Sequence, residues 1–98
     1  MVTELALLLR EPGSGPAFEA AFAGVASLLT GADGYVRHRL LPTLDDADHY
    51  LLQVEWRDLA AHTVGFELSD AHARFIASLE PMLAGAPIVV HVPAGERP

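Results

Sequence analysis

The clearest alternation of hydrophobic and polar side chains lies in the middle of the chain, from residue 50 to residue 56. Side chains two positions apart in a strand point the same way, so one face is apolar and carries Tyr50, Leu52, Val54 and Trp56. Asp58 follows and can cap a helix by accepting a hydrogen bond from a backbone N–H. The pattern predicts a strand that passes directly into a short helix, with the single tryptophan of the chain at the junction.

A break and a longer helix are predicted after this short helix, which carries His62. Gly65 interrupts the helical pattern, and Ser69 is a favourable N-cap for the next helix. Pro81 kinks or ends that helix, because its ring cannot continue the hydrogen-bond pattern. The side chains that recur at helical spacing and should face the core are His72, Phe75, Ile76, Leu79 and Leu83.

The flanking segments add one helix and three strands. Residues 2–10 have apolar side chains on both faces, as expected of a strand that is covered on two sides. Residues 16–30 predict a helix, and residues 35–41 and 86–92 predict strands. The resulting order is β-α-β-β-α-α-β, which is typical of a ferredoxin-like α+β fold. We therefore expect an antiparallel four-stranded sheet with its helices on one face.

The two central strands should form a hairpin that fixes which residues face the helices. A loop centred near Asp46 places Arg37 opposite Glu55, which gives the arginine a charge partner. In this register the helix-facing side is shared by Val36, His38, Leu40, Leu52, Val54 and Trp56. We predict one domain over residues 1–93 and a frayed tail over residues 94–98.

The composition favours self-association and argues against several partners. The chain has 98 residues, and a domain of this size buries only about two-thirds of its unfolded surface. With 51% hydrophobic residues, a homodimer with its sheets packed face to face is the expected way to bury more. A net charge of −7 without any lysine argues against nucleic acid. No apolar run is long enough to span a membrane, and no export signal is found, so we expect a cytoplasmic protein.

The succession of Val54-Glu55-Trp56, His62, Gly65-Phe66, Ser69 and Phe75 resembles the antibiotic biosynthesis monooxygenase family over nearly the whole chain. The resemblance implies a small ferredoxin-like domain that dimerises into an α/β barrel. It also implies that Trp56 lines the substrate pocket, as a tryptophan does at this position in the polyketide-tailoring members. Those members have an asparagine four residues earlier, where this chain has Leu52.

The haem-degrading branch of the same family is a poor match. That branch uses an asparagine in the first strand, and this chain contains none. Phe66 stands where that branch has its helix tryptophan, and the iron-ligand position falls near Phe75 or Ile76, neither of which can bind a metal.

Two histidines are candidates for a general base. His62 matches a histidine that is common in the family, and His38 should share the inner strand face with Trp56. Both have an alternative interpretation as hydrogen-bonded structural histidines. His91 also recurs in the family, where it is expected at an interface or in the barrel. The residues expected to contact a flat aromatic ligand are Leu52, Trp56, Phe66 and Phe75.

The sequence predicts no metal and no cofactor. Neither an HxH nor an HExxH spacing occurs, and the acidic turn around Asp45, Asp46 and Asp48 lacks the calcium-loop pattern. No nucleotide-binding glycine fingerprint is found either. An oxidation would thus depend on a substrate that activates oxygen itself once it is deprotonated.

Two functions remain open. The first is a cofactor-independent monooxygenase that acts on a small quinol-like or anthrone-like aromatic, with His38 or His62 as base. The second is a non-catalytic dimeric barrel that binds a small apolar molecule or serves assembly. A pocket in which at least two polar side chains converge favours the enzyme, and a wholly apolar pocket favours the binding protein.

Overall fold

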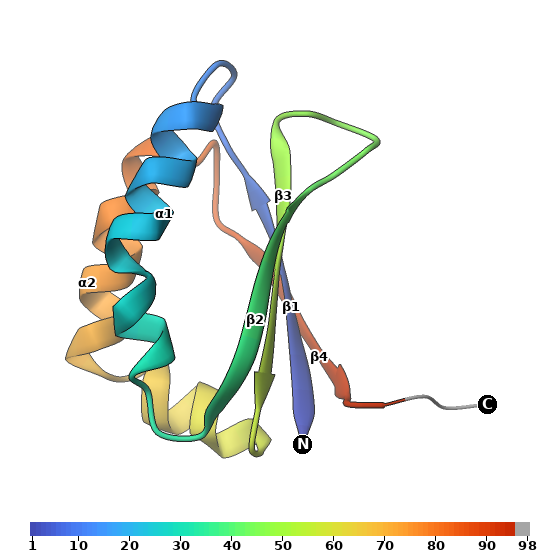
Figure 1. Cartoon of the computed structure of the whole chain (residues 1–98), viewed down its shortest axis with the longest axis vertical. Helices are drawn as coiled ribbons and strands as arrows, with labels where there is room; N and C mark the ends of the chain where they lie inside the picture. Colours follow the sequence, from blue (N-terminus) through green and yellow to red (C-terminus); the bar gives the residue numbers. More distant parts are fainter. Residues whose placement is uncertain (96–98) are drawn as a thin grey trace.

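The computed structural model describes residues 1–95, and its four strands form one antiparallel sheet in the order β2-β3-β1-β4. The strands are β1 (Val2–Leu9), β2 (Tyr35–Pro42), β3 (His49–Trp56) and β4 (Ile88–Pro93). The helices are α1 (Gly15–Thr30), α2 (Asp70–Leu79), the π-helix η1 (Ala61–Phe66) and the 3₁₀-helix η2 (Glu80–Met82). Both long helices lie on the same side of the sheet (Figure 1). The predicted ferredoxin-like class is confirmed.

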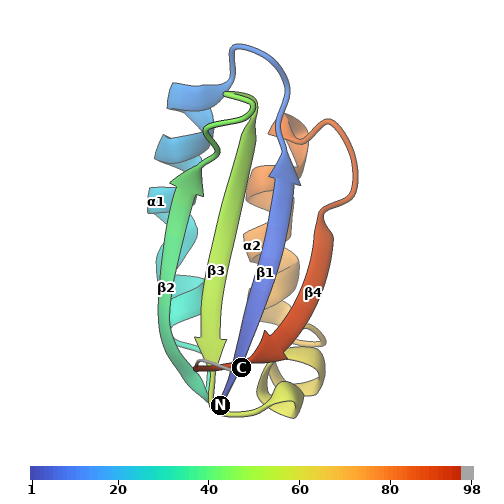
Figure 2. The ribbon, with the colours of Figure 1, turned by 90° about the vertical axis from the view of Figure 1, so that its right-hand side faces the viewer.

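Within the described part of the chain the opposite face of the sheet carries no helix, as Figure 2 shows, with the strands in front and the helices behind. On this face, the outer sides of β1 and β4 present neighbouring apolar side chains. Ile88 and Val90 of β4 are 56% and 51% exposed. They stand opposite Leu7 and Leu5 of β1 in the sheet register. We call these four residues the open apolar face.

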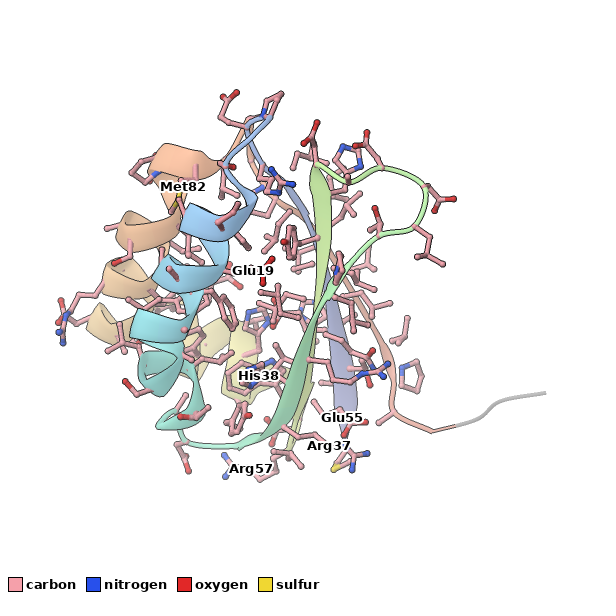
Figure 3. The ribbon with its side chains drawn as sticks, turned by 45° about the horizontal axis from the view of Figure 1, so that its top comes forward. Glu19, Arg37, His38, Glu55, Arg57 and Met82 are labelled. Carbon is pink, nitrogen blue, oxygen red and sulfur yellow. The ribbon has the colours of Figure 1, made fainter. Side chains whose placement is uncertain are left out.

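The hairpin register is confirmed at its charge pair and wrong at one residue. Arg37 pairs with Glu55 in the β2–β3 ladder, and the two side chains form an ion pair (Figure 3). A β-bulge between Tyr35 and Arg37 removes Val36 from the ladder and leaves it 44% exposed. Tyr35 takes the predicted inner place of Val36 and packs edge-on against Trp56, with ring centroids 6.3 Å apart.

One strand boundary and one helix type also differ from expectation. The last strand begins at Ile88 rather than at residue 86, after a turn that follows η2. The segment that carries His62 is a π-helix, in which the backbone N–H of Glu67 donates to the carbonyl of His62, five residues earlier, at 2.7 Å. Of the predicted tail, residues 96–98 lie outside the described part of the chain.

The core lies between the helices and the sheet. Phe18 and Phe22 of α1 and Phe75 and Leu79 of α2 are buried against the inner side of β1 and β3. Trp56 and Val54 at the end of β3 are 0% exposed. No helix in residues 1–95 is long and apolar enough to cross a membrane.

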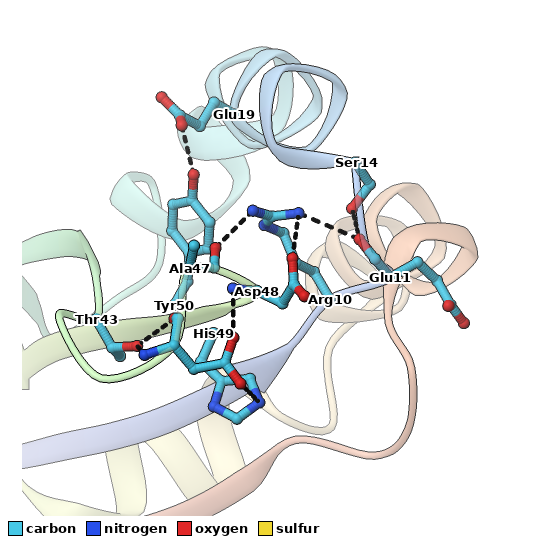
Figure 4. A network of polar contacts seen from close by, with 10 residues as sticks. Arg10, Glu11, Ser14, Glu19, Thr43, Ala47, Asp48, His49 and Tyr50 are labelled. Carbon is cyan, nitrogen blue, oxygen red and sulfur yellow. Dashed lines mark hydrogen bonds and ion pairs between the residues drawn. The ribbon is translucent and has the colours of Figure 1, made fainter.

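A buried arginine holds the end of β1 against the β2–β3 loop (Figure 4). Arg10 donates to the carbonyls of Glu11 and Ala47 and forms an ion pair with Asp48 at 3.4 Å. Its guanidinium lies 5.5 Å from the centroid of the Tyr50 ring. These contacts hold the β2–β3 loop against the end of β1.

Candidate functional site

A cavity of about 310 Å³ lies between α2 and the inner face of the sheet. Most of its wall is apolar, and the sheet contributes Ala6, Leu8, Leu52, Val54 and Val89. The helical side contributes Phe66, Phe75, Ile76, Leu79 and Leu83. Four titratable side chains complete the wall, namely Glu4, His62, Glu67 and His72. The cavity is thus an apolar space with polar groups that converge from different elements.

Glu4 is the buried centre of these polar groups, with 7% of its surface exposed. The indole N–H of Trp56 donates to Glu4 Oε1 at 3.0 Å. His62 Nε2 lies 3.4 Å from the same oxygen, and His62 Nδ1 lies 2.7 Å from His91 Nε2. The imidazole of His62 stacks on the indole of Trp56, with ring centroids 5.2 Å apart and planes 18° apart.

The local structure explains why these side chains meet. Glu4 belongs to the same face of β1 as Ala6 and Leu8, so the two-residue period turns it toward the helices. In the sheet it stands opposite His91 of β4. Asp58 accepts a hydrogen bond from the backbone N–H of Ala61 at 2.8 Å and so caps the segment that carries His62.

Burial controls the ionisation of this group. It raises the pKa of Glu4 above its ordinary value, since a carboxylate is poorly solvated here, and the hydrogen bond from Trp56 opposes this rise. Burial, and next the neighbouring His91, lower the pKa of His62 to about 4, while Glu67 acts in the opposite direction. Burial lowers the pKa of His72 as well. Each shift moves its group toward the uncharged form, which favours neutral imidazoles at His62 and His72 and makes the Glu4 carboxylate a stronger base than usual.

Several predicted site residues line the cavity and two do not. His62, Leu52, Phe66 and Phe75 are part of the wall. Trp56 lies behind His62, where it holds Glu4 by its N–H and supports the imidazole by stacking.

His38 faces the helices from β2 but lies outside the cavity wall (Figure 3). Its Nδ1 is 2.6 Å from the hydroxyl of Tyr35, and its ring centroid is 5.7 Å from that of Phe22. These contacts match the alternative interpretation of His38 as a hydrogen-bonded structural histidine.

Sequence reasoning missed Glu4 and Glu67, and it placed His72 on the core-facing stripe of the helix without assigning it to the site. The signal for Glu4 was present, because a carboxylate at an inner position of an otherwise apolar strand must be desolvated or paired. Glu67 could not be found in this way, since it follows the π-helix, whose extra residue changes which side chains face the sheet.

A second hollow, of about 380 Å³, lies at the C-terminal end of α1, around Arg57 and Asp58. Its charged residues are paired with each other, because Arg57 forms ion pairs with Asp33 and Asp58 at 3.3 and 3.6 Å. In residues 1–95 no group of three His, Asp or Glu side chains is arranged to hold a metal ion. The cavity beside Glu4 is therefore the candidate site.

Comparison with known proteins agrees with this geometry. The profile of the family described as antibiotic biosynthesis monooxygenase matches residues 1–78. The chain belongs to this family. Within it, the uncharacterised protein YczJ of Bacillus subtilis is 36% identical over 91 residues, which cover 93% of this chain and 96% of YczJ.

Solved structures show the same fold. A candidate antibiotic biosynthesis monooxygenase from Bordetella bronchiseptica has a TM-score of 0.92 at 26% identity, with 97% of both chains covered. SnoaB, a cofactor-independent oxygenase from Streptomyces nogalater, has a TM-score of 0.82 at 22% identity, with 98% of this chain and 94% of SnoaB covered. At this identity, the similarity to SnoaB concerns the fold alone. Membership of the antibiotic biosynthesis monooxygenase family makes the enzyme hypothesis the first to consider.

Proposed function

We propose that this protein is a cofactor-independent monooxygenase that oxidises a small electron-rich aromatic molecule in the cavity beside Glu4. The observation that carries the proposal is an apolar cavity that closes on a buried carboxyl group and a neutral imidazole, Glu4 and His62. Membership of the monooxygenase family and the fold shared with SnoaB support the same class of reaction.

The size and the wall of the cavity suit a compact aromatic substrate. Its volume of about 310 Å³ is at the lower end of the range of small-molecule sites. Phe66 and Phe75 offer aromatic surface on the helical side. Four titratable side chains converge on the cavity, which favours the enzyme over a protein that only binds an apolar molecule.

The reaction requires oxygen and a base but no bound redox group. A substrate methylene loses one proton to the base, and the resulting carbanion transfers electrons to molecular oxygen, so that a carbon–oxygen bond forms. The peroxide takes up a proton and loses water to leave a carbonyl group. The balance is CH₂ + O₂ → C=O + H₂O, with one oxygen atom in the product and one in water. The protein binds the substrate, excludes water and exchanges protons.

We also propose that the protein works as a homodimer in which the open apolar face is covered by a second copy. Support comes from the apolar side chains of this face, exposed on β4 and half-buried on β1, which no helix within residues 1–95 covers. An obligate interface of this kind buries on the order of 2,000 Å² or more.

Oxygen uptake with labelled oxygen tests the enzymatic proposal. A panel of anthrones and quinols is incubated with the protein and ¹⁸O₂ in buffer that contains a metal chelator. We expect uptake of one O₂ for each substrate molecule oxidised and one ¹⁸O atom in each product molecule formed from a methylene. Binding of panel members without uptake above that of heat-denatured protein would favour the non-catalytic alternative.

A further inference from the structure

Three side chains form a continuous chain of contacts from the cavity to the edge of the sheet. Glu4 lies on β1, His62 on η1 and His91 on the edge strand β4. The carboxyl oxygen Oε1 is 3.4 Å from His62 Nε2, and His62 Nδ1 is 2.7 Å from His91 Nε2. Glu4 and His62 are buried, whereas His91 is half-buried. We call these three residues the Glu4–His91 chain.

The polar contacts limit where each proton can lie. When Glu4 is ionised it only accepts, so His62 carries its hydrogen on Nε2 and its Nδ1 accepts from His91 Nε2–H. When Glu4 holds a proton, the carboxyl group donates to His62 Nε2, and His62 Nδ1–H donates to His91 Nε2. The two arrangements differ only in where the protons lie, because no ring has to rotate.

We propose that Glu4 is the base that takes the substrate's proton and that His62 and His91 form a proton relay between Glu4 and the edge of the sheet. This proposal rests on the monooxygenase function proposed above. It assigns the base to Glu4, which leaves the two histidines as positioning residues that act through it.

The second carboxyl oxygen of Glu4, Oε2, is the one left for a substrate. Trp56 and His62 both approach Oε1, and no hydrogen bond to Oε2 occurs within residues 1–95. Glu4 is part of the cavity wall. In the proposed step, a substrate C–H or O–H bond breaks and its proton passes to Oε2. Rotation of the carboxyl group about its Cγ–Cδ bond then exchanges the two oxygens and presents this proton to His62 Nε2. The electron pair stays on the substrate and goes to oxygen, and a proton returns through Glu4 when the peroxide forms.

Other charged and titratable groups lie near the Glu4–His91 chain. They influence its protonation but do not replace Glu4 as the base. Glu67 Oε2 lies 3.8 Å from His62 Nε2, and 49% of the Glu67 side chain is exposed. His72 of α2 lines the same cavity and packs edge-on against Phe66. Trp56 of β3 contributes the indole N–H and no charge. Among these residues, Glu4 combines burial, a place in the cavity wall and two contacts that both go to one of its oxygens.

The single tryptophan provides a readout that needs no substrate. Its indole N–H donates to Glu4, so the one indole cross-peak in a ¹H–¹⁵N spectrum should follow the ionisation of Glu4. We expect the peak to titrate with a midpoint above the ordinary glutamate value of 4.5. The titration should vanish in Glu4→Gln.

Glu19→Gln is the matched control for that titration. Glu19 also accepts a hydrogen bond from a buried aromatic side chain, the hydroxyl of Tyr50, but it lies outside the cavity wall. The indole peak of Glu19→Gln should titrate as in the wild type. If Glu4→Gln does not fold, Glu4→Asp serves instead, and its indole midpoint should shift.

Nitrogen spectra of the histidines test the relay itself. His62 should carry its hydrogen on Nε2 above the Glu4 midpoint and on Nδ1 below it. A His62 tautomer that stays the same while the indole peak titrates would overturn the relay. An indole peak that does not move between pH 4 and 9 would overturn the role of Glu4 as a titrating base.

Activity separates this proposal from the function on which it rests. Glu4→Gln should lower kcat by about 10²–10⁴-fold, the range for loss of a general base, with little change in KM. His91→Ala should lower kcat and be rescued by added imidazole, which a purely structural role does not predict. Full oxidation by Glu4→Gln refutes the role of Glu4 but leaves the monooxygenase intact. Absence of oxidation by the wild type refutes the monooxygenase, while the spectra still decide whether the proton relay exists.

Discussion

Replacement of Trp56 by Phe tests how much the hydrogen bond from the indole N–H stabilises the protein, apart from the packing of the aromatic ring. The substitution keeps an aromatic ring at a position that is 0% exposed and removes the N–H that donates to Glu4. A buried acceptor that loses its donor costs about 1–3 kcal/mol. In a domain of this length each kcal/mol lowers Tm by about 4–8 °C, so a fall of about 4–24 °C is expected at pH 8. The carboxylate is the form that needs the donor, and therefore the loss should shrink as the pH falls through the pKa of Glu4.

A double-mutant cycle measures the same interaction directly. Trp56→Phe is made in the wild type and in Glu4→Gln, and unfolding is followed by circular dichroism at one fixed protein concentration. We expect a coupling of about 1–3 kcal/mol at pH 8 and a smaller coupling at pH 4. Equal destabilisation in both backgrounds, independent of pH, would refute the reasoning, and Trp56 would then be a packing residue only.

Three further predictions follow from other parts of the molecule. The folded-state pKa of His62 is about 4, below its ordinary 6.5, so the unfolded chain binds the proton more tightly. The free energy of unfolding should therefore fall as the pH drops from 6.5 to about 4. Urea titrations at a series of pH values should show a smaller fall over this range in His62→Gln. Val90→Arg places a charge in the open apolar face, and in sedimentation we expect a dimer for the wild type and a monomer for this variant. A wild-type monomer at micromolar concentration contradicts the proposed assembly. The purified protein should be colourless, and a Soret band, a flavin band or one equivalent of transition metal by elemental analysis contradicts the prediction of no cofactor.

The fold was accessible from the sequence because its signals are long or paired. The alternation in β3 runs over seven residues, and the charge pair Arg37–Glu55 selects one hairpin register among its neighbours. The bulge at Val36 leaves no such signal, since one additional residue in a strand changes neither composition nor length enough to be noticed.

The candidate site could be predicted only in part from the sequence. Its apolar wall follows from the same periodicity that predicts the elements, which is why Leu52, Phe66 and Phe75 were identified. His38 has the expected inner orientation, but it stands on β2, at the far edge of the sheet from β4. Whether an inner-facing histidine reaches a cavity depends on where the helices leave space, and that is a property of tertiary packing. Glu4 escaped notice because the leucines around it dominate both faces of β1.

The π-helix η1 has a consequence for how relatives of this protein can be compared. A π turn contains one residue more than an α turn, and each residue of an α-helix turns the chain by about 100°. Removal of one residue between Ala61 and Phe66 should leave the sheet and both long helices intact, yet rotate His62 away from Glu4. The number of residues between β3 and α2 is therefore as informative as their identity. Family members with a shorter connection are expected to lack this contact even where the histidine is retained.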